Sequence, residues 1–158
     1  MSTSRTSTQS ATERRSAEAE LRGLIAKFAP KHLRLIGTLR RKLRTRLPTA
    51  HEMVYEYRDS FVISLSPSGR GFEGVLVISG SASGVRLYMS KGLPDPGKLL
   101  QGSGGKARWI PVEGASTLTR PAVARLIAAA IKRNRVPFER TGRGSVVVRL
   151  TAAKKRRS

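Results

Sequence analysis

The chain has 158 residues, of which 39% are hydrophobic, and 31 lysine and arginine residues against 10 acidic ones give it a formal net charge of +21. This length suits a single domain with a modest core. The absence of cysteine excludes disulfides, thiol nucleophiles and thiolate metal sites, and no apolar run is long enough for a membrane span or a signal peptide, so we expect a cytoplasmic protein without a membrane partner.

The N-terminal region is polar at first and then has the apolar period of a helix. Residues 1–15 are predicted to form a disordered polar and basic tail, although helical periodicity already begins near Glu13. A first helix is predicted to stop before Pro30. Its apolar stripe consists of Leu21, Leu24, Ile25 and Phe28.

A second helix is predicted over residues 31–47, and Pro48 ends it. Its core positions are Leu33, Ile36, Leu39 and Leu43. The other face is predicted to be a basic surface, because the segment contains no acidic residue. The basic residues on that face are Arg34, Arg40, Arg41, Lys42, Arg44 and Arg46.

From His51 the apolar period falls to two, which is typical of strands. Short turns separate the four strand-like segments, so an antiparallel meander is predicted. These segments are "EMVYEY", "SFVISLS", "FEGVLVIS" and "GVRLYMS", and "KARWIPV" follows as a fifth strand after a longer loop.

A last helix is predicted to be capped by Thr119, to hold Pro121 in its first turn and to end near Asn134. Its apolar stripe is Val123, Leu126, Ile127, Ala130 and Ile131. Residues 146–150 could add an edge strand.

This order predicts an α+β two-layer sandwich, in which an antiparallel sheet of five to six strands carries the N- and C-terminal helices on one face. The predicted domain covers residues 16–136. Residues 137–158 are expected to be a basic extension that could form one short edge strand and is disordered after it.

The stretch "KGLPDPGKLLQGSGGKARWIPV", residues 91–112, raises the question of a phosphate-binding loop. A Walker-type loop needs a glycine five residues before Gly-Lys and a hydroxyl after it. Leu100 and Ala107 occupy these positions, and a strand rather than a helix follows. The glycines Gly102, Gly104 and Gly105 are therefore interpreted as a structural turn, with an anion nest as the alternative. Lys106 is a candidate anion contact or a solvated loop lysine.

Arg108 starts the fifth strand on its core-facing side. An unpaired charge there would be costly. We therefore predict that Arg108 pairs with Asp95 or with carbonyl groups of the loop.

The stretch "LPDPGKLLQGSGGKARWIPV", together with "LPTAHEMVYEY" and "LTRPAVARLIAAAI", resembles the YdhG-like family of small bacterial domains over about residues 21–133. The resemblance implies a frataxin-like architecture, with helices on one face of an antiparallel sheet. It also implies a non-enzymatic binding or adaptor module, and intracellular iron handling as in some relatives.

The residues themselves offer little for iron or for catalysis. The first helix carries Glu13, Glu18 and Glu20 among arginines, and a cationic surface repels iron ions. His32 and His51 have no metal-pair spacing, so no metal ligand and no cofactor is assigned. Ser103 and the pair Glu52/Glu56 lack partners for catalysis, and we predict no catalytic residue. The two glutamates are expected to be solvent-facing charges or partners of nearby arginines.

Nucleic acid, or another polyanion, is the alternative partner. The positive charge is not confined to the two ends of the chain. Without residues 1–15 and 137–158, residues 16–136 keep a net charge of +13. Such a field attracts phosphate backbones without sequence choice. However, 22 of the 31 basic residues are arginine, which a GC-rich genome would also favour.

Strand alternation gives this alternative a candidate site. It places Trp109, Arg86 and Tyr88 together on the open face of the sheet, where they could stack single-stranded bases. Alternatively, Trp109 covers sheet surface, packs under the C-terminal tail or forms a homodimer contact. A second set of backbone contacts is predicted on the second helix, at Arg34, Arg41 and Arg44.

Overall fold

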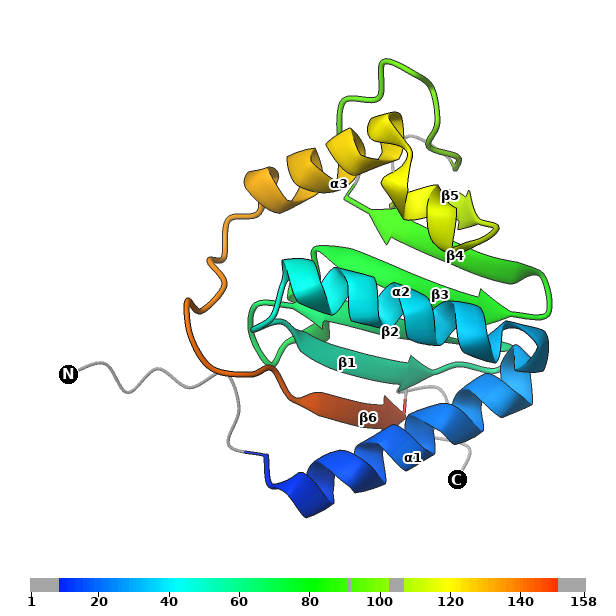
Figure 1. The fold of residues 1–158 in the computed structure, drawn as a ribbon, viewed down its shortest axis with the longest axis vertical. Coiled ribbons are helices and arrows are strands. Elements are labelled where there is room, and N and C mark those ends of the chain that lie inside the picture. Colours follow the sequence, from blue (N-terminus) through cyan, green and yellow to red (C-terminus); the bar gives the residue numbers. More distant parts are fainter. Residues whose placement is uncertain (1–8, 91, 103–106, 151–158) are drawn as a thin grey trace.

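The computed structural model describes residues 9–90, 92–102 and 107–150, and it is an α+β two-layer sandwich (Figure 1). Two helices, α1 (Ala11–Phe28) and α2 (Leu33–Arg46), precede the sheet. The strands are β1 (His51–Glu56), β2 (Ser60–Ser66), β3 (Leu76–Ser81), β4 (Gly84–Met89), β5 (Arg108–Val112) and β6 (Val146–Leu150), with α3 (Pro121–Arg133) between the last two.

The sheet has the strand order β5-β4-β3-β2-β1-β6. The first five strands form the predicted antiparallel meander, because short turns connect β1 to β4. After α3 the chain runs back across the molecule and adds β6 beside β1, and this pair is parallel (Figure 1). The predicted edge strand at residues 146–150 is therefore present, and it makes the sheet mixed.

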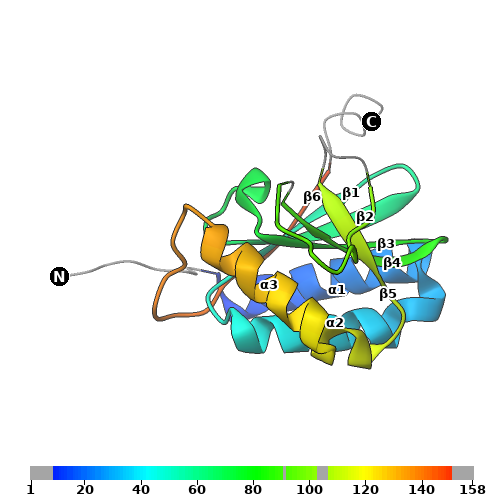
Figure 2. The same cartoon turned by 90° about the horizontal axis from the view of Figure 1, so that it is seen from above.

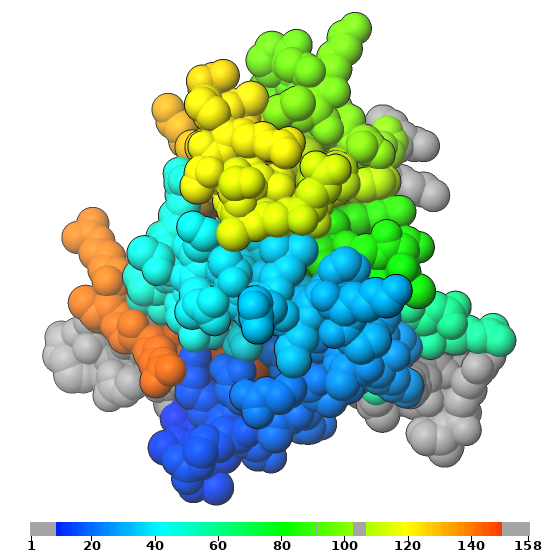
Figure 3. Space-filling model, turned by 45° about the vertical axis from the view of Figure 1, so that its right-hand side comes forward, coloured from blue at the N-terminus to red at the C-terminus, as the bar shows by residue number. Residues whose placement is uncertain are grey.

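All three helices cover the same face of the sheet (Figure 2), and α1 and α2 lie side by side on the surface of that layer (Figure 3). The core forms between the two layers from the alternate strand residues and the helix stripes. Ile36, Leu39, Phe61, Ile63, Ile78 and Leu87 are fully buried there. Among the described residues, no α-helix lies on the other face of the sheet.

Helix α1 begins earlier than predicted. Ser10 caps it in a capping box: the backbone N–H of Glu13 donates to Ser10 Oγ, and the Ser10 backbone N–H donates to the Glu13 carboxylate. The predicted disordered tail of residues 1–15 is therefore too long, since residues 9–15 have defined structure. The stripe Leu21, Leu24 and Ile25 is buried as predicted.

Three other local predictions were wrong. Leu33, expected in the core, is 44% exposed, because a 3-10 turn over Pro30–His32 makes it the first residue of α2. The predicted third strand begins only at Leu76, since Gly71–Glu73 form a 3-10 turn. Thr119 does not cap α3. It ends a 3-10 turn and donates to the Ser116 carbonyl.

Several side-chain contacts attach β6 to the rest of the domain. The amide of Gln9 accepts from Val146 N–H and donates to the Val146 carbonyl, at 3.0 and 2.6 Å. Ser145 Oγ lies 2.8 Å from His51 Nδ1. At Gly144 an added Cβ would lie 1.7 Å from the Ala50 carbonyl oxygen, so only glycine permits this approach. The two ends of the described chain are thus held together at the β6 edge.

Within the described residues, no helix combines the length and the apolar character that crossing a membrane requires.

Candidate nucleic-acid interface

The helix-free face of the sheet gathers Arg86, Tyr88 and Trp109, as strand alternation predicts. Tyr88 pairs directly with Trp109 across β4 and β5, and Arg86 pairs with Pro111. Their neighbours Val85, Leu87 and Ile110 point the other way and are buried under the helices. The predicted grouping of these three side chains on one face is therefore correct.

The three side chains contact one another. The Arg86 guanidinium lies over the Trp109 ring, with Cζ 3.8 Å from the ring centroid, and Arg86 Nη1 donates to Tyr88 Oη at 3.3 Å. The Tyr88 and Trp109 ring centroids are 6.3 Å apart. Arg86 and Trp109 are half-buried, and a cation–π contact in such a place stabilises the cluster by about 0.5–2 kcal/mol. It also orders the arginine side chain before any ligand arrives.

A mainly apolar groove of about 520 Å³ opens beside Tyr88 on the same face. It is lined by Tyr55, Tyr57, Val62, Ser64, Gly71, Phe72, Val77, Tyr88 and Ala107. Phe72 is 84% exposed, the most exposed of the large hydrophobic residues described. The groove and the adjacent Trp109 therefore hold all three tyrosines and the single tryptophan of the chain.

The sequence prediction missed Tyr55, Tyr57 and Phe72. The two tyrosines could have been found, because they alternate with the core residue Val54 and so share the open face. Phe72 could not, because it was assigned to a strand. The 3-10 turn that carries it folds over the sheet: Ser64 Oγ donates to the Gly71 carbonyl at 2.8 Å, and a Cβ at Gly71 would lie 2.1 Å from Tyr55 Oη.

The loop before β5 fixes the position of Trp109. Asp95 accepts from the N–H groups of Leu99 and Leu100 at 2.9 and 2.8 Å, and Arg108 Nη2 lies 3.3 Å from Asp95 Oδ2, which confirms the predicted pair. Gln101 and Trp109 exchange two backbone hydrogen bonds, so the loop extends the ladder beyond β5.

The glycines of this loop are described only in part. Gly102 has φ +107°, in the region that favours glycine, and it packs beside the Trp109 indole. A turn built on glycine is thus confirmed at this position. The other predicted loop residues, Gly104, Gly105 and Lys106, lie outside the described residues.

The arginines predicted on the second helix belong to a different surface. Arg34, Arg41 and Arg44 lie on α2, in the helical layer, whereas Trp109 faces away from that layer. Figure 2 shows the sheet between the helices and the open face. The predicted contact residues therefore divide between two sides of the molecule and cannot form one continuous site.

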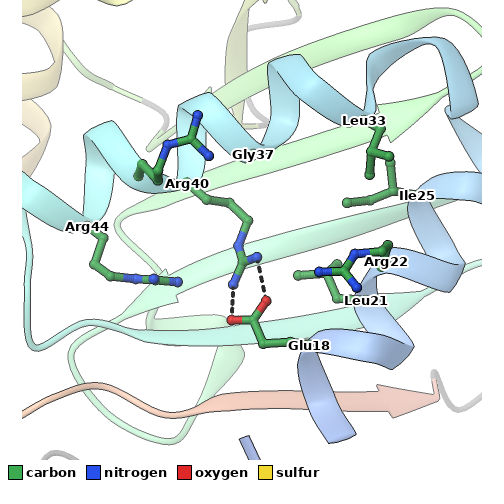
Figure 4. A pocket seen from close by; sticks show the side chains of 9 residues that line it. Glu18, Leu21, Arg22, Ile25, Leu33, Gly37, Arg40 and Arg44 are labelled. Atoms are coloured by element: carbon green, nitrogen blue, oxygen red, sulfur yellow. Dashed lines mark hydrogen bonds and ion pairs between the residues drawn. The ribbon is translucent and has the colours of Figure 1, made fainter. Parts of the chain in front are cut away.

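Arg40 was predicted on the exposed basic face of α2, but it points inward. Its side chain is 12% exposed and binds Glu52 through Nε at 2.6 Å. It also binds Glu18 through Nη1 at 2.8 Å (Figure 4). Arg44 also binds Glu52. The prediction that the second helix presents an unbroken basic face was wrong, because β1 supplies the buried Glu52 and α1 supplies the half-buried Glu18, acids that the segment itself lacks.

Glu52 and Glu56 are buried, so the prediction of solvent-facing charges was wrong. The alternative, a partner of nearby arginines, is correct for Glu52, whereas Glu56 pairs with a lysine, Lys27, at 2.9 Å. Burial opposes ionisation of Glu52, but the hydrogen bonds and charges of Arg40 and Arg44 outweigh it and hold its pKa below the ordinary value. Hydrogen bonds from Arg40 likewise lower the pKa of Glu18.

Metal-ligating residues are scattered in the part of the chain that the structure describes. It contains no group of three or more His, Asp or Glu side chains that could hold a metal ion. Glu18 binds Arg40 and Glu13 belongs to the capping box of α1, so two of the candidate iron ligands already have partners. The iron-handling role implied by the family resemblance receives no support from this geometry.

Comparison of the chain with protein-family models, with curated proteins and with solved structures gives no significant match.

Proposed function

We propose that this protein is a non-enzymatic binding module that holds single-stranded nucleic acid on the open face of its sheet. One observation carries the proposal: Trp109, Tyr88, Tyr55, Tyr57 and Phe72 form a single aromatic surface around an apolar groove, with Arg86 stacked on the tryptophan. Bases stack on such rings irrespective of sequence, and each base contributes about 1–3 kcal/mol.

Positive charge near this surface supports phosphate contacts. Arg58 follows Tyr57 in the chain, and both residues are exposed. Arg70 precedes the 3-10 turn that carries Phe72, and these two residues are also exposed, although Gly71 between them is half-buried. Arg149 is exposed and pairs with Tyr55 in the sheet. Cations beside a stacking surface can bind the backbone while the rings bind the bases.

The proposal favours single strands over duplexes. In a duplex the bases stack on each other and their flat faces are inaccessible, so an aromatic platform gains nothing from them. A duplex would meet only the charge of the protein, and its binding would depend steeply on salt.

Oligonucleotide binding tests the proposal directly. The affinity for labelled single-stranded and double-stranded oligonucleotides is measured by fluorescence anisotropy. Quenching of Trp109, the only tryptophan, reports contact with the open face. We expect Phe72→Ala and Tyr88→Ala each to weaken single-strand binding by roughly 5- to 150-fold, the equivalent of one lost stacked base.

Leu33→Ala is the matched control, because Leu33 is an exposed apolar side chain on the helical layer, away from the groove. It should change the affinity by less than about twofold. Equal binding by the three variants, or equal affinity for single strands and duplexes, would refute the stacking role of the open face.

A second copy of the chain is the competing occupant of the same surface, because an exposed aromatic patch also suits a protein interface. Sedimentation of the protein with and without oligonucleotide distinguishes the two. A dimer that Phe72→Ala dissociates, combined with no effect of this variant on oligonucleotide affinity, would assign the groove to self-association.

A further inference from the structure

A second pocket lies on the opposite side of the molecule, between α1 and α2. Its volume is about 230 Å³, and Figure 4 shows Arg40 bound to Glu18, with Arg22 and Arg44 on either side. The lining residues are Glu18, Leu21, Arg22, Ile25, Leu33, Gly37, Arg40, Arg41 and Arg44. The pocket is thus small, open to solvent and rich in arginine.

The pocket has an excess of positive charge. Four guanidinium groups line it, whereas among the described residues two carboxylates, those of Glu18 and Glu52, bind to them, which leaves a net charge of +2. Arg40 is the internal partner of both carboxylates. The remaining charge therefore belongs to Arg22, Arg41 and Arg44.

These three arginines keep donors for a ligand. Arg41 makes one side-chain hydrogen bond, from Nη2 to Thr38 Oγ1 at 3.1 Å, and Arg44 binds Glu52 through Nη2 alone. Arg22 is exposed and forms no hydrogen bond or ion pair with any residue the structure describes. Each guanidinium carries five N–H donors, so most donors of the three groups are unused.

The base of the pocket is already ordered. Arg40 bridges Glu18 on α1 and Glu52 on β1, and Glu52 in turn holds Arg44. A ligand would therefore meet the guanidinium of Arg44, which Glu52 holds in place, and the exposed guanidinium groups of Arg22 and Arg41. These groups come from both helices, and the two helices need no further ordering before the ligand binds. Binding to such a preorganised site costs less conformational entropy.

We infer that this pocket binds a phosphate group, either as inorganic phosphate or as the phosphate of a small monoester. Phosphate carries more than one negative charge and several acceptor oxygens, and planar guanidinium groups match it in paired hydrogen bonds. The inference is independent of nucleic-acid binding, because the sheet separates this pocket from the aromatic face.

The test measures the affinity for inorganic phosphate, adenosine monophosphate and adenosine by isothermal titration calorimetry at low ionic strength. Wild-type protein should bind at least one of the two phosphates, and adenosine should not bind. The double variant Arg22→Ala/Arg41→Ala should weaken phosphate binding about tenfold or more, since it removes two guanidinium groups that donate charge-assisted hydrogen bonds to the phosphate. Both side chains are exposed, so this variant should keep its fold.

Arg46→Ala is the matched control, because Arg46 is an exposed arginine on α2 that does not line the pocket. It should change the phosphate affinity by less than about twofold. The inference is overturned if no phosphate binds up to about 10 mM, or if the double variant and Arg46→Ala behave alike.

Two further readouts separate this inference from the proposed function. Phosphate should leave Trp109 fluorescence unchanged, whereas an oligonucleotide on the open face should quench it. If only oligonucleotides bind, and the double variant abolishes that binding, the pocket is part of a nucleic-acid surface and the assignment to a small phosphate is wrong.

Discussion

Glu52 occupies a core-facing position of β1, two residues before Val54, yet it is ionised. It is 3% exposed and binds two arginines of α2, which replace the water that burial removes. A buried charge of this kind adds little net stability while both partners are present, but removal of one partner leaves the other charge uncompensated. The buried charge of Arg40 is therefore compensated by Glu52 and Glu18, and loss of either carboxylate would leave it less well compensated.

We predict that Glu52→Ala lowers the free energy of unfolding by about 3–5 kcal/mol, because Arg40 stays buried without its principal partner. Urea denaturation measures this change. Glu113→Ala is the control: Glu113 forms an exposed pair with Arg120, and its loss should cost at most about 1 kcal/mol. Similar losses in the two variants would show that the Arg40 network contributes no more than a surface pair.

Among the elements, β6 depends most on contacts distant in sequence. It pairs with β1, and His51 at the start of β1 accepts a hydrogen bond at Nδ1 from the Ser145 N–H, at 3.1 Å. An accepting Nδ1 requires that this nitrogen carry no proton. Burial lowers the pKa of His51, although the charge of Glu139 opposes the shift. The folded state therefore favours the neutral ring.

Because the pKa of His51 is lowered in the folded state, the sign of its contribution to stability as the pH changes can be predicted. A histidine whose pKa is lower in the folded state stabilises the fold fully above its unfolded pKa of about 6.5, and the contribution is lost as pH falls below that value. We expect the Tm to fall between about pH 7.5 and 5.5, a window in which the carboxylates of Glu18 and Glu52 stay ionised.

His51→Asn is the matched variant, since its side-chain oxygen can still accept from Ser145 but does not titrate. Its Tm should change much less across the same range in thermal unfolding. An equal decrease in both proteins would assign the pH dependence to other groups.

For the whole molecule, the distribution of charge decides how it meets a polyanion. Residues 1–8 and 151–158 hold five of the 31 basic residues and no acidic residue, so residues 9–150 retain a net charge of +16. Those residues include every helix and strand that the structure describes. The aromatic face and most of the electrostatic field therefore belong to the same folded unit.

We predict that a chain of residues 9–150 keeps single-strand binding and loses only part of its salt dependence. The slope of log affinity against log salt should decrease by at most about 0.7 for each of the five removed cations that contacts a phosphate. Anisotropy titrations at several salt concentrations measure the slope. Loss of all binding in the shortened chain would place the contacts in the terminal segments rather than on the sheet.

The sequence alone determined the α+β class, the helix-covered face and the grouping of Arg86, Tyr88 and Trp109, because periods of 3.6 and two residues are local properties. It also determined the Asp95–Arg108 pair, since alternation places Arg108 on the core side. Only the tertiary structure decided the rest. Three features depend on partners distant in sequence. They are the inward orientation of the Arg40 side chain, the turn that brings Phe72 over the sheet, and the parallel pairing of β6 with β1. His51 and Ser145, for example, are 94 residues apart, and local periodicity cannot specify such a contact.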